Sequence, residues 1–482
     1  MASAGRARVI ALFGAVLALA SADTSTVGAI APQLEHAFQI SNTKIGLLSS
    51  VTLLVGALFV LPVGVLVDRF KRIPILSASV VLWSCASLLS AFATSYSMLL
   101  FTRLGLGAVT ATAVPAIASL TGDYFPASQR GRIYSYILAG EAAGTAIGFI
   151  ISGSIASAVS WRWAFVLLAL PGFFLARTLW RTVPEPARGK QRGLEAGTGD
   201  DDPNGEQPAE LAHAVARRRG VGPDPALVLK EDPDRMGLWR AIRYTLRVPS
   251  NVVMITSSAL GWFFFAGLQT FAVLFVRGHY HAGQGATQLA LALLVAGAVV
   301  GNLIGGWLTD ALLRRGVLGA RVLVPTVCYL AGAGVLVPGI LATRLSAALL
   351  FDVLGAGLLA AANPGLDAAR LDIMPALLWG RAESTRTFLR SLGQAAAPLL
   401  FGATSDLIAG VSLAEAPVGT TAGVVSHSEA QGLEITFLIM LSSLVAAGLL
   451  LLRARRTYPR DVATAAASQE AQDALAGRAG NG

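Results

Sequence analysis

Charged residues are scarce in this chain. They make up 13% of its 482 residues, whereas about a quarter of an ordinary soluble protein is charged. A soluble protein of this length would lack the charges needed to cover its surface, so that class is excluded. The net charge of +9 does not indicate a nucleic-acid partner, because the basic residues lie in alternate loops between long apolar runs.

Cysteine and the common catalytic motifs are nearly or wholly missing. Cys85 and Cys328 both lie in apolar segments, which argues against a disulfide framework and favours buried, inert thiols. The chain contains no P-loop, no nucleophile elbow and no paired zinc-binding histidines, and His279-x-His281 lacks further ligands. We therefore expect no cofactor, no metal ion and no enzymatic activity, and an ATP-driven pump is disfavoured.

Long apolar runs dominate what is present. Hydrophobic residues make up 54% of the chain, and the mean hydropathy is +0.63. Crossing about 30 Å of hydrocarbon takes roughly 20 residues in a helix. The chain therefore predicts an all-α membrane protein with twelve transmembrane helices. The predicted spans are residues 9–31, 45–67, 74–93, 97–121, 132–158, 162–180, 250–276, 288–312, 321–341, 346–368, 386–409 and 433–452.

The apolar runs form two groups of six. We predict an N-terminal six-helix bundle over residues 1–180 and a C-terminal six-helix bundle over residues 249–456. The linker 181–248 is rich in proline, glycine and charge, so we predict that it is mostly disordered. Within it, residues 237–247 mix Leu and Trp with Arg, a pattern that favours a short helix on the membrane surface. The tail 457–482 is also predicted to be disordered.

The distribution of Lys and Arg predicts the orientation. The loops on the side of both termini and the linker are rich in these residues. The opposite loops hold little beyond Lys44, Arg162, Arg277 and Arg344. Because cytoplasmic loops carry such an excess, we predict a multi-pass protein of the cell membrane with both termini in the cytoplasm.

Two short patterns occur once in each half. Residues 64–68 (Gly-Val-Leu-Val-Asp) return as residues 306–310 (Gly-Trp-Leu-Thr-Asp), 242 positions later, and basic residues follow both. Residues 123–127 (Asp-Tyr-Phe-Pro-Ala) return as residues 372–376 (Asp-Ile-Met-Pro-Ala), 249 positions later. Parallel repeats of six helices are an architecture of secondary transporters.

The first of these patterns resembles a family signature. Residues 64–76 are similar to the loop G-x-L-a-D-r-x-G-R-r-x of the major facilitator superfamily, with Lys71 where that family usually has Gly. Residues 103–107 (Arg-Leu-Gly-Leu-Gly) resemble its R-x-x-x-G motif. The likeness covers nearly all of the chain except the linker and the tail. It implies the major facilitator fold, in which two pseudo-symmetric six-helix bundles transport a substrate by alternating access.

A narrower likeness lies in the first half. Residues 23–27, Pro32 and Glu35 resemble the first helix of Spinster-like transporters, and residues 103–125 and 130–148 resemble later parts of the same family. That family is associated with lysophospholipids and sphingosine-type lipids.

Three ionisable residues stand out inside the predicted spans of the first half, where a charge costs at least about 2.5–3.5 kcal/mol. Asp23 lies roughly 21 Å from the cytoplasmic end of its helix, at about 1.5 Å per residue, and Arg103 lies at a similar depth. We expect these two to pair, so that protonation of Asp23 frees Arg103 to hold an anion. The alternatives are a capped polar residue at a helix break and a fixed structural ion pair. Glu141 is a third candidate for proton coupling, and its alternative is a neutral Glu hydrogen-bonded across the helix-packing glycine stripe of residues 140–148.

The repeat places amides opposite two of these acids. Asp23 corresponds to Gln269 and Glu141 to Gln394. We therefore predict that the first half carries the ionisable groups and that the second half contributes neutral ones. Residues 262–265 (Trp-Phe-Phe-Phe) favour an amphipathic or aromatic substrate over a sugar. The predicted substrate cavity is lined by Thr24, Thr26, Thr110, Gln269, Phe265 and Gln394.

The polar loop motifs have a different predicted role. In the superfamily that the chain resembles, the Asp at the position of Asp68 bridges to neighbouring helix ends and holds the cytoplasmic side shut. An Asp near a helix N-terminus gains about 0.3–1 kcal/mol, and the nearest candidate is the start of span 11 near Thr385. The alternative is that these charges only set the topology. The predicted cytoplasmic gate comprises Gly64, Asp68, Arg69, Arg72, Arg130, Arg132, Asp310, Arg381, Glu383 and Arg386.

The sequence thus favours a secondary active transporter of an amphipathic organic substrate, a lysophospholipid-like lipid first, with proton coupling. Thr24 and Thr110 stand where Spinster-like transporters commonly have Arg and Glu, which leaves room for an exporter of drugs or small organic solutes. A membrane sensor that does not transport and a membrane-embedded enzyme are the alternatives from other classes. The gating motifs favour a moving protein over a static enzyme. The expected partners are membrane lipids, the substrate and protons, with no nucleic acid, and we expect a monomer.

Overall fold

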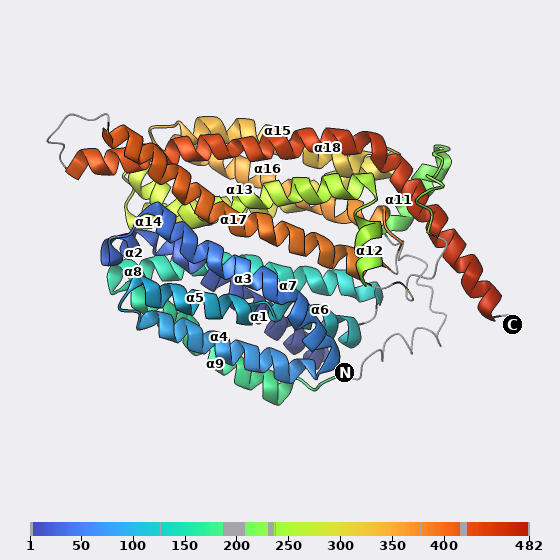
Figure 1. Cartoon of the computed structure of the whole chain (residues 1–482), viewed down its shortest axis with the longest axis horizontal. Helices are drawn as coiled ribbons and strands as arrows, with labels where there is room; N and C mark the ends of the chain where they lie inside the picture. The colour runs from blue at the N-terminus through green and yellow to red at the C-terminus, as the bar shows by residue number, and fades with distance from the viewer. Residues whose placement is uncertain are drawn as a thin grey trace. The chain divides into compact units, whose positions relative to one another are not determined.

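The fold is helical throughout the residues that a computed structural model of the chain describes, which are 3–125, 127–186, 208–229, 236, 238–375, 378–414 and 422–480 (Figure 1). The first half contains α1 (Ser3–Ala29), α2 (Ala31–Phe38), α3 (Asn42–Arg69), α4 (Arg72–Ala91), α5 (Tyr96–Thr110), α6 (Ala113–Tyr124), α7 (Ala127–Ile147), the π-helix η1 (Gly148–Ser152), α8 (Gly153–Ala158) and α9 (Trp161–Thr182). It is followed by α11 (Pro208–Arg218), α12 (Leu238–Thr245), α13 (Pro249–His279), α14 (Gln284–Arg314), α15 (Ala320–Ile340), α16 (Leu345–Asp372), α17 (Trp379–Ala414) and α18 (Ala422–Gly480).

The predicted spans lie within these helices or extend past their ends by no more than a few residues. Eleven segments of the described residues are long and apolar enough to cross a membrane. The remaining predicted span, 386–409, lies within α17, where Gln394 and Asp406 are among the polar residues. Predicted span 97–121 is divided between α5 and α6. Pro115 stands in the first turn of α6, where its missing N–H is tolerated.

The chain forms two compact units that do not follow the two halves of the sequence. Unit 1 combines Met1–Gly205 with Phe265–Ala292 and Gln394–Phe437, and unit 2 comprises Glu206–Phe264, Leu293–Gly393 and Leu438–Gly482. Unit 1 thus contains all first-half helices together with one end of α13, α14, α17 and α18. We call the end of unit 1 that carries α2 the distal end; it lies opposite the N-terminus in Figure 1.

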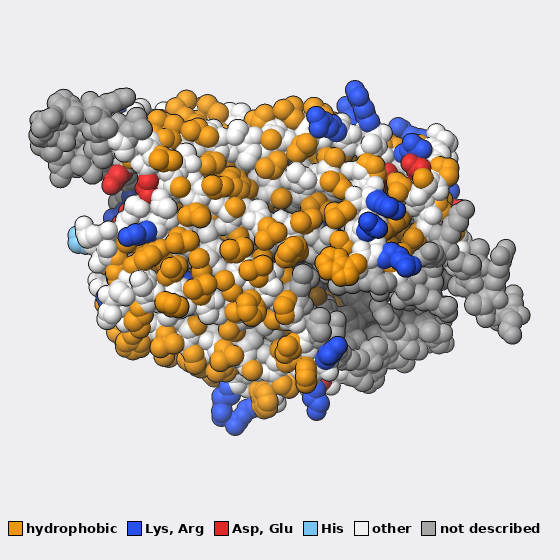
Figure 2. All heavy atoms as spheres, in the orientation of Figure 1, with side chains coloured by type: hydrophobic (Ala, Val, Ile, Leu, Met, Phe, Trp, Pro, Cys, Tyr) orange, Lys and Arg blue, Asp and Glu red, His pale blue; other side chains and the backbone are white. Residues whose placement is uncertain are grey.

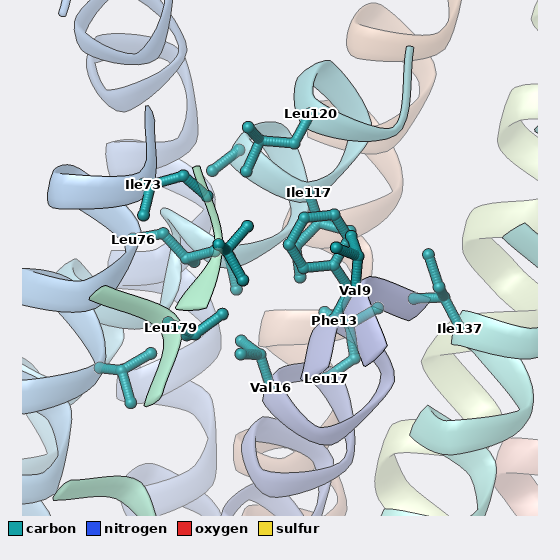
Figure 3. Close-up of a cluster of buried hydrophobic side chains, with 14 of the residues drawn as sticks. Val9, Phe13, Val16, Leu17, Ile73, Leu76, Ile117, Leu120, Ile137 and Leu179 are labelled. Atoms are coloured by element: carbon teal, nitrogen blue, oxygen red, sulfur yellow. The ribbon is translucent and has the colours of Figure 1, made fainter. Parts of the chain in front are cut away.

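An apolar cluster joins the first-half helices within unit 1 (Figure 3). Phe13 of α1 is fully buried and lies beside Ile117 of α6, with Leu76 of α4 and Leu179 of α9 in the same cluster. Ile137 of α7 approaches from the other side of α1. Dispersion contacts of this kind hold helices together in lipid, where burial from water gives no advantage. The cluster fixes α1 between α6 and α7.

The glycine stripe of α7 packs against α1, as its spacing predicts. A Cβ atom on Gly144 would lie 2.0 Å from the carbonyl oxygen of Ala18, and one on Gly140 would lie 2.9 Å from that of Gly14. Gly148, in η1, approaches Ala22 in the same way. Small residues let the two backbones approach more closely than side chains would permit.

The outer surface of the helices is apolar. Figure 2 shows hydrophobic side chains over most of the visible face, with Lys and Arg side chains concentrated toward one side. Phe101 of α5 is 73% exposed and Phe174 of α9 is 72% exposed. Such surfaces suit hydrocarbon rather than water, and the protein is a multi-pass membrane protein.

The structure differs from the predicted disorder of the linker and the tail. Within the described residues of the linker, α11 and α12 are helical, and α12 lies where the surface helix was expected. Predicted tail residues 457–482 continue α18 as far as Gly480. Hydrogen bonds join the linker to the tail in unit 2, where the Asp224 N–H donates to Thr464 and the Leu229 N–H donates to Ser468. The composition of the linker or of the tail, taken alone, does not reveal these contacts between them.

Candidate functional site

The centre of the first half holds a buried ion pair. Arg103 of α5 donates from Nη1 to Oδ2 of Asp23 on α1 at 3.0 Å, and each side chain is only 1% exposed. The two residues are 80 positions apart in the sequence. The structure therefore brings together the acid and the base whose equal depths predict a pair.

Neighbouring side chains complete the environment of this pair. Ser87 of α4 donates to Oδ1 of Asp23 at 3.3 Å, and Arg103 Nη2 donates to Ser90 Oγ at 2.9 Å. The guanidinium carbon of Arg103 lies 4.6 Å from the ring centre of Phe165 on α9. An aromatic face attracts a cation most strongly where water is excluded. The pair thus links four helices of the first bundle, α1, α4, α5 and α9.

The threonines of the predicted cavity lie in different surroundings. Thr24 is exposed, unlike the adjacent buried Asp23, and its hydroxyl donates to the backbone carbonyl of Ala20 at 3.0 Å. Thr26 is buried, and its hydroxyl shares a 2.7 Å hydrogen bond with that of Ser152 in η1. Thr110 is half-buried at the end of α5, where its hydroxyl donates to the backbone carbonyl of Leu106 at 3.0 Å.

The other predicted site residues also belong to unit 1. Gln269 and Gln394 are half-buried, on α13 and α17, and Phe265 is 38% exposed. A Cβ on Gly28 would lie 2.4 Å from the backbone oxygen of Gln269, so α1 and α13 cross in direct backbone contact there. Glu141 is half-buried beside the glycine stripe of α7.

The sequence analysis missed several charged residues inside the predicted spans of the second half, among them Arg390 and Asp352. Arg390 lies within predicted span 386–409, and its guanidinium carbon is 4.6 Å from the ring centre of Trp262. Asp352 lies within predicted span 346–368, half-buried, with its Oδ1 against Gly339. The prediction of a second half with only neutral groups is therefore wrong. That prediction compared only Asp23 and Glu141 with the residues at their repeat positions. Arg390 and Asp352 stand at neither of those positions, and a search of the predicted spans for charged residues would have found both.

The basic residue at the start of α4 has a partner that the motif does not contain. Arg72 is buried, and its Nε donates to Glu185, just beyond α9, at 3.0 Å. Glu185 also accepts the backbone N–H groups of Arg72 at 3.0 Å and Ile73 at 2.7 Å. Burial alone would raise the pKa of Glu185, but these backbone and guanidinium donors outweigh burial and lower it. A carboxylate thus caps the positive end of the α4 helix dipole.

The other predicted gate residues divide into two sets. Arg69 is exposed at the end of α3. The surroundings of Gly64 and the side chains of Asp68, Arg130, Arg132 and Arg381 lie outside what the structure describes. In unit 2, Arg386 donates to Asp367 at 2.7 Å and to Glu383 at 2.9 Å, and Arg370 also pairs with Glu383.

A buried arginine also stands at a helix start in the second half, as Arg72 does in the first. Arg321, 249 residues later, stands at the start of α15 and pairs with Asp372, which also accepts from the Tyr458 hydroxyl. Its Nη2 lies 3.9 Å from Asp310, one of the predicted gate residues. Both halves thus place a buried arginine at a helix start, although each half supplies a different acid.

A comparison with known protein families identifies the family to which the chain belongs. A sequence profile of the Major Facilitator Superfamily matches residues 13–398, most of the chain. The chain belongs to the Major Facilitator Superfamily. This membership confirms both the predicted fold class and the resemblance seen in the loop motifs, and it makes the protein a membrane transporter.

Individual relatives of this superfamily member are distant. Protein spinster homolog 1 of Xenopus laevis is 32% identical over 171 residues, which cover 35% of this chain and 32% of that protein. The 4-hydroxybenzoate transporter PcaK of Pseudomonas putida is 30% identical over 181 residues, covering 38% of this chain and 40% of that protein. The chain therefore matches less than half the length of either curated relative.

A solved structure matches over far more of this superfamily member. The crystal structure of a bacterial homologue of the human lysosomal transporter Spinster, described as inward-facing and unoccupied, aligns with a TM-score of 0.76. The alignment covers 96% of this chain and 99% of that one at 20% sequence identity. At this identity the likeness establishes the fold, which agrees with the Spinster-like pattern in the first half.

Proposed function

We propose that this transporter moves an amphipathic organic substrate by alternating access coupled to protons, and that the leading substrate class is a lysophospholipid-like lipid. The Spinster likeness supports the lipid class. A carrier or exporter of small organic solutes is the second candidate, which the similarity to a 4-hydroxybenzoate transporter favours.

The buried pair of Asp23 and Arg103 is the observation that carries the proposal. A buried ion pair seldom stabilises a protein more than apolar residues of similar size would. A pair kept inside a membrane-spanning bundle therefore supports a role that needs charge. Protonation of Asp23 would cancel the attraction and leave Arg103 in need of another anion, which would loosen the contact between α1 and α5. Glu141 is the second proposed proton-binding group.

The second half supplies features that suit an amphipath with an anionic head group. Arg390 presents a cation against Trp262, and Phe265 of the same helix as Trp262 is partly exposed. In the proposed cavity Phe265 contacts apolar parts of the substrate, and Thr24, Gln269 and Gln394 contribute hydrogen bonds.

The charged clusters at the helix ends are proposed to form the cytoplasmic gate. Ion pairs such as Arg386 with Asp367, and Arg72 with Glu185, can hold one conformation of the cycle and release in the other. The proposed orientation places both termini in the cytoplasm of a monomer in the cell membrane.

Flux into proteoliposomes tests the function. We expect the purified protein to move a labelled lysophospholipid across the membrane, several-fold faster with an imposed pH gradient than without it. The control is Glu470→Gln, which changes an exposed surface pair with Arg217 that contributes little. Movement of 4-hydroxybenzoate but not of the lipid would favour the second candidate. Movement of no amphipath, drug or small solute would contradict transport and favour a sensor.

A further inference from the structure

We propose that Asp406 is a latch residue that holds the distal ends of α3 and α17 together during one stage of the transport cycle, and that protonation of Glu35 strengthens this latch. The inference rests on the proposed alternating-access function. It concerns the distal end of unit 1, away from the loop motifs that define the superfamily.

Asp406 caps a helix that lies more than 360 residues away in the sequence. Its Oδ1 accepts the backbone N–H of Asn42 at 3.2 Å, and its Oδ2 accepts that of Thr43 at 2.8 Å. The Thr43 hydroxyl also donates to Oδ2. The first N–H groups of a helix have no partner within the helix, and a carboxylate is favoured at the positive end of the dipole. Asp406 of α17 thus supplies the N-terminal cap of α3, since the side chain of the flanking Ser41 makes no capping hydrogen bond.

The backbones of α3 and α17 approach closely around this cap. A Cβ on Gly46 would lie 2.1 Å from the Pro398 carbonyl oxygen, and one on Gly402 would lie 2.3 Å from that of Asn42. The backbone N–H of Leu399, the residue after Pro398 within α17, donates to Ser50 Oγ at 2.9 Å. Two helices from different halves of the sequence are therefore in direct backbone contact.

Such a contact has the properties of a latch. When the two bundles rock apart at the distal end, α3 moves away from α17 and its N–H groups lose the carboxylate. Asp406 then stabilises only the state in which the distal ends are packed together, which is the differential interaction that a conformational equilibrium requires.

Glu35 tunes the latch because it faces other acids. It lies on α2, and the negative groups that act on it are Asp406 on α17 and Glu429 on α18. Lys44, on the neighbouring α3, has its ammonium 5.6 Å from the ring centre of Tyr96. Burial, reinforced by the two acids, raises the pKa of Glu35 to about 8. When the distal ends separate, the pKa falls towards the ordinary value of about 4.3.

The sign of the pH effect follows from this difference. A proton binds Glu35 more tightly in the packed state, so low pH favours that state. The preference for the packed state is fully present below the pKa of Glu35 in the separated state, and it is lost progressively as pH rises to about 8. Above that value the packed state bears a half-buried negative charge that is repelled by Asp406 and Glu429.

Distances between spin labels test the latch directly. Labels on Lys44→Cys and Leu407→Cys, both exposed positions, would report the separation of α3 and α17 in lipid nanodiscs, with Cys85 and Cys328 replaced by Ser. We expect Asp406→Ala to raise the ratio of separated to packed molecules at least about tenfold, equivalent to about 1.4 kcal/mol. Asp406→Asn keeps one acceptor and should have a smaller effect. Glu470→Gln is the control and should leave the ratio unchanged.

The pH arm of the experiment uses Glu35→Gln. The labelled parent should shift towards separated molecules between pH 5 and pH 9, whereas Glu35→Gln should stay packed throughout. An unchanged ratio in Asp406→Ala, or the same pH response with and without Glu35, would overturn the latch. These distances do not depend on any substrate. A normal latch response in a protein without flux would therefore count against the proposed function alone, and normal flux with no latch response would count against the latch alone.

Discussion

Replacing Arg103 with Leu is expected to abolish transport and to lower the free energy of unfolding by about 3–5 kcal/mol. The substitution leaves Asp23 buried and charged without its partner, in a site where each side chain is 1% exposed. It also removes the cation that lies against Phe165. Thermal unfolding in detergent and flux in proteoliposomes would measure the two effects.

The double variant Asp23→Asn with Arg103→Leu distinguishes the effect of the ion pair on stability from its effect on transport. With no charge left unpaired, the stability should recover most of the loss, while proton-coupled flux should remain absent. Arg455→Leu, at an exposed arginine of α18, is the matched control and should change neither property. If the double variant recovered its stability and kept proton-coupled flux unaltered, the ion pair would have only a structural role.

Replacing Gly144 with Ala is expected to have the second largest effect. The new Cβ would lie 2.0 Å from the Ala18 carbonyl oxygen and 2.4 Å from its Cα, and a backbone cannot yield as the tip of a side chain can. Overpacking typically costs about 1–3 kcal/mol and occasionally more. We expect a marked fall in folded yield and in the unfolding temperature.

Gly105 provides the matched control for this substitution. It lies in α5 of the same half, and a Cβ there would meet no atom within 4 Å. Gly105→Ala should therefore leave yield and unfolding temperature unchanged. Equal effects at the two positions would show that loss of glycine, rather than the contact between α1 and α7, is responsible.

The sequence allowed prediction of those features that repeat or that carry a fixed spacing. The stripe of residues 140–148 has the four-residue spacing of one helix face, and it packs on α1 as expected. The partnership of Asp23 and Arg103 followed from their equal depth in two predicted spans.

The caps could not be predicted in the same way. Glu185 caps α4 from beyond α9, and Asp406 caps α3 from α17. Each contact joins residues more than 100 positions apart, and neither acid belongs to a local motif. Only the packing of the helices places a carboxylate at a distant helix start. The hydrogen bonds between the linker and the tail of α18 likewise join residues more than 200 positions apart.

Proton movement driven by substrate tests the central claim most directly. Proteoliposomes containing a pH-sensitive dye would be exposed to a lysophospholipid with no imposed gradient, and the internal pH would be followed. We predict that the wild-type protein changes the internal pH in proportion to the lipid moved, and that the variant combining Asp23→Asn with Glu141→Gln does not. Lipid movement without any proton movement, or proton movement that is intact in the double variant, would contradict the account.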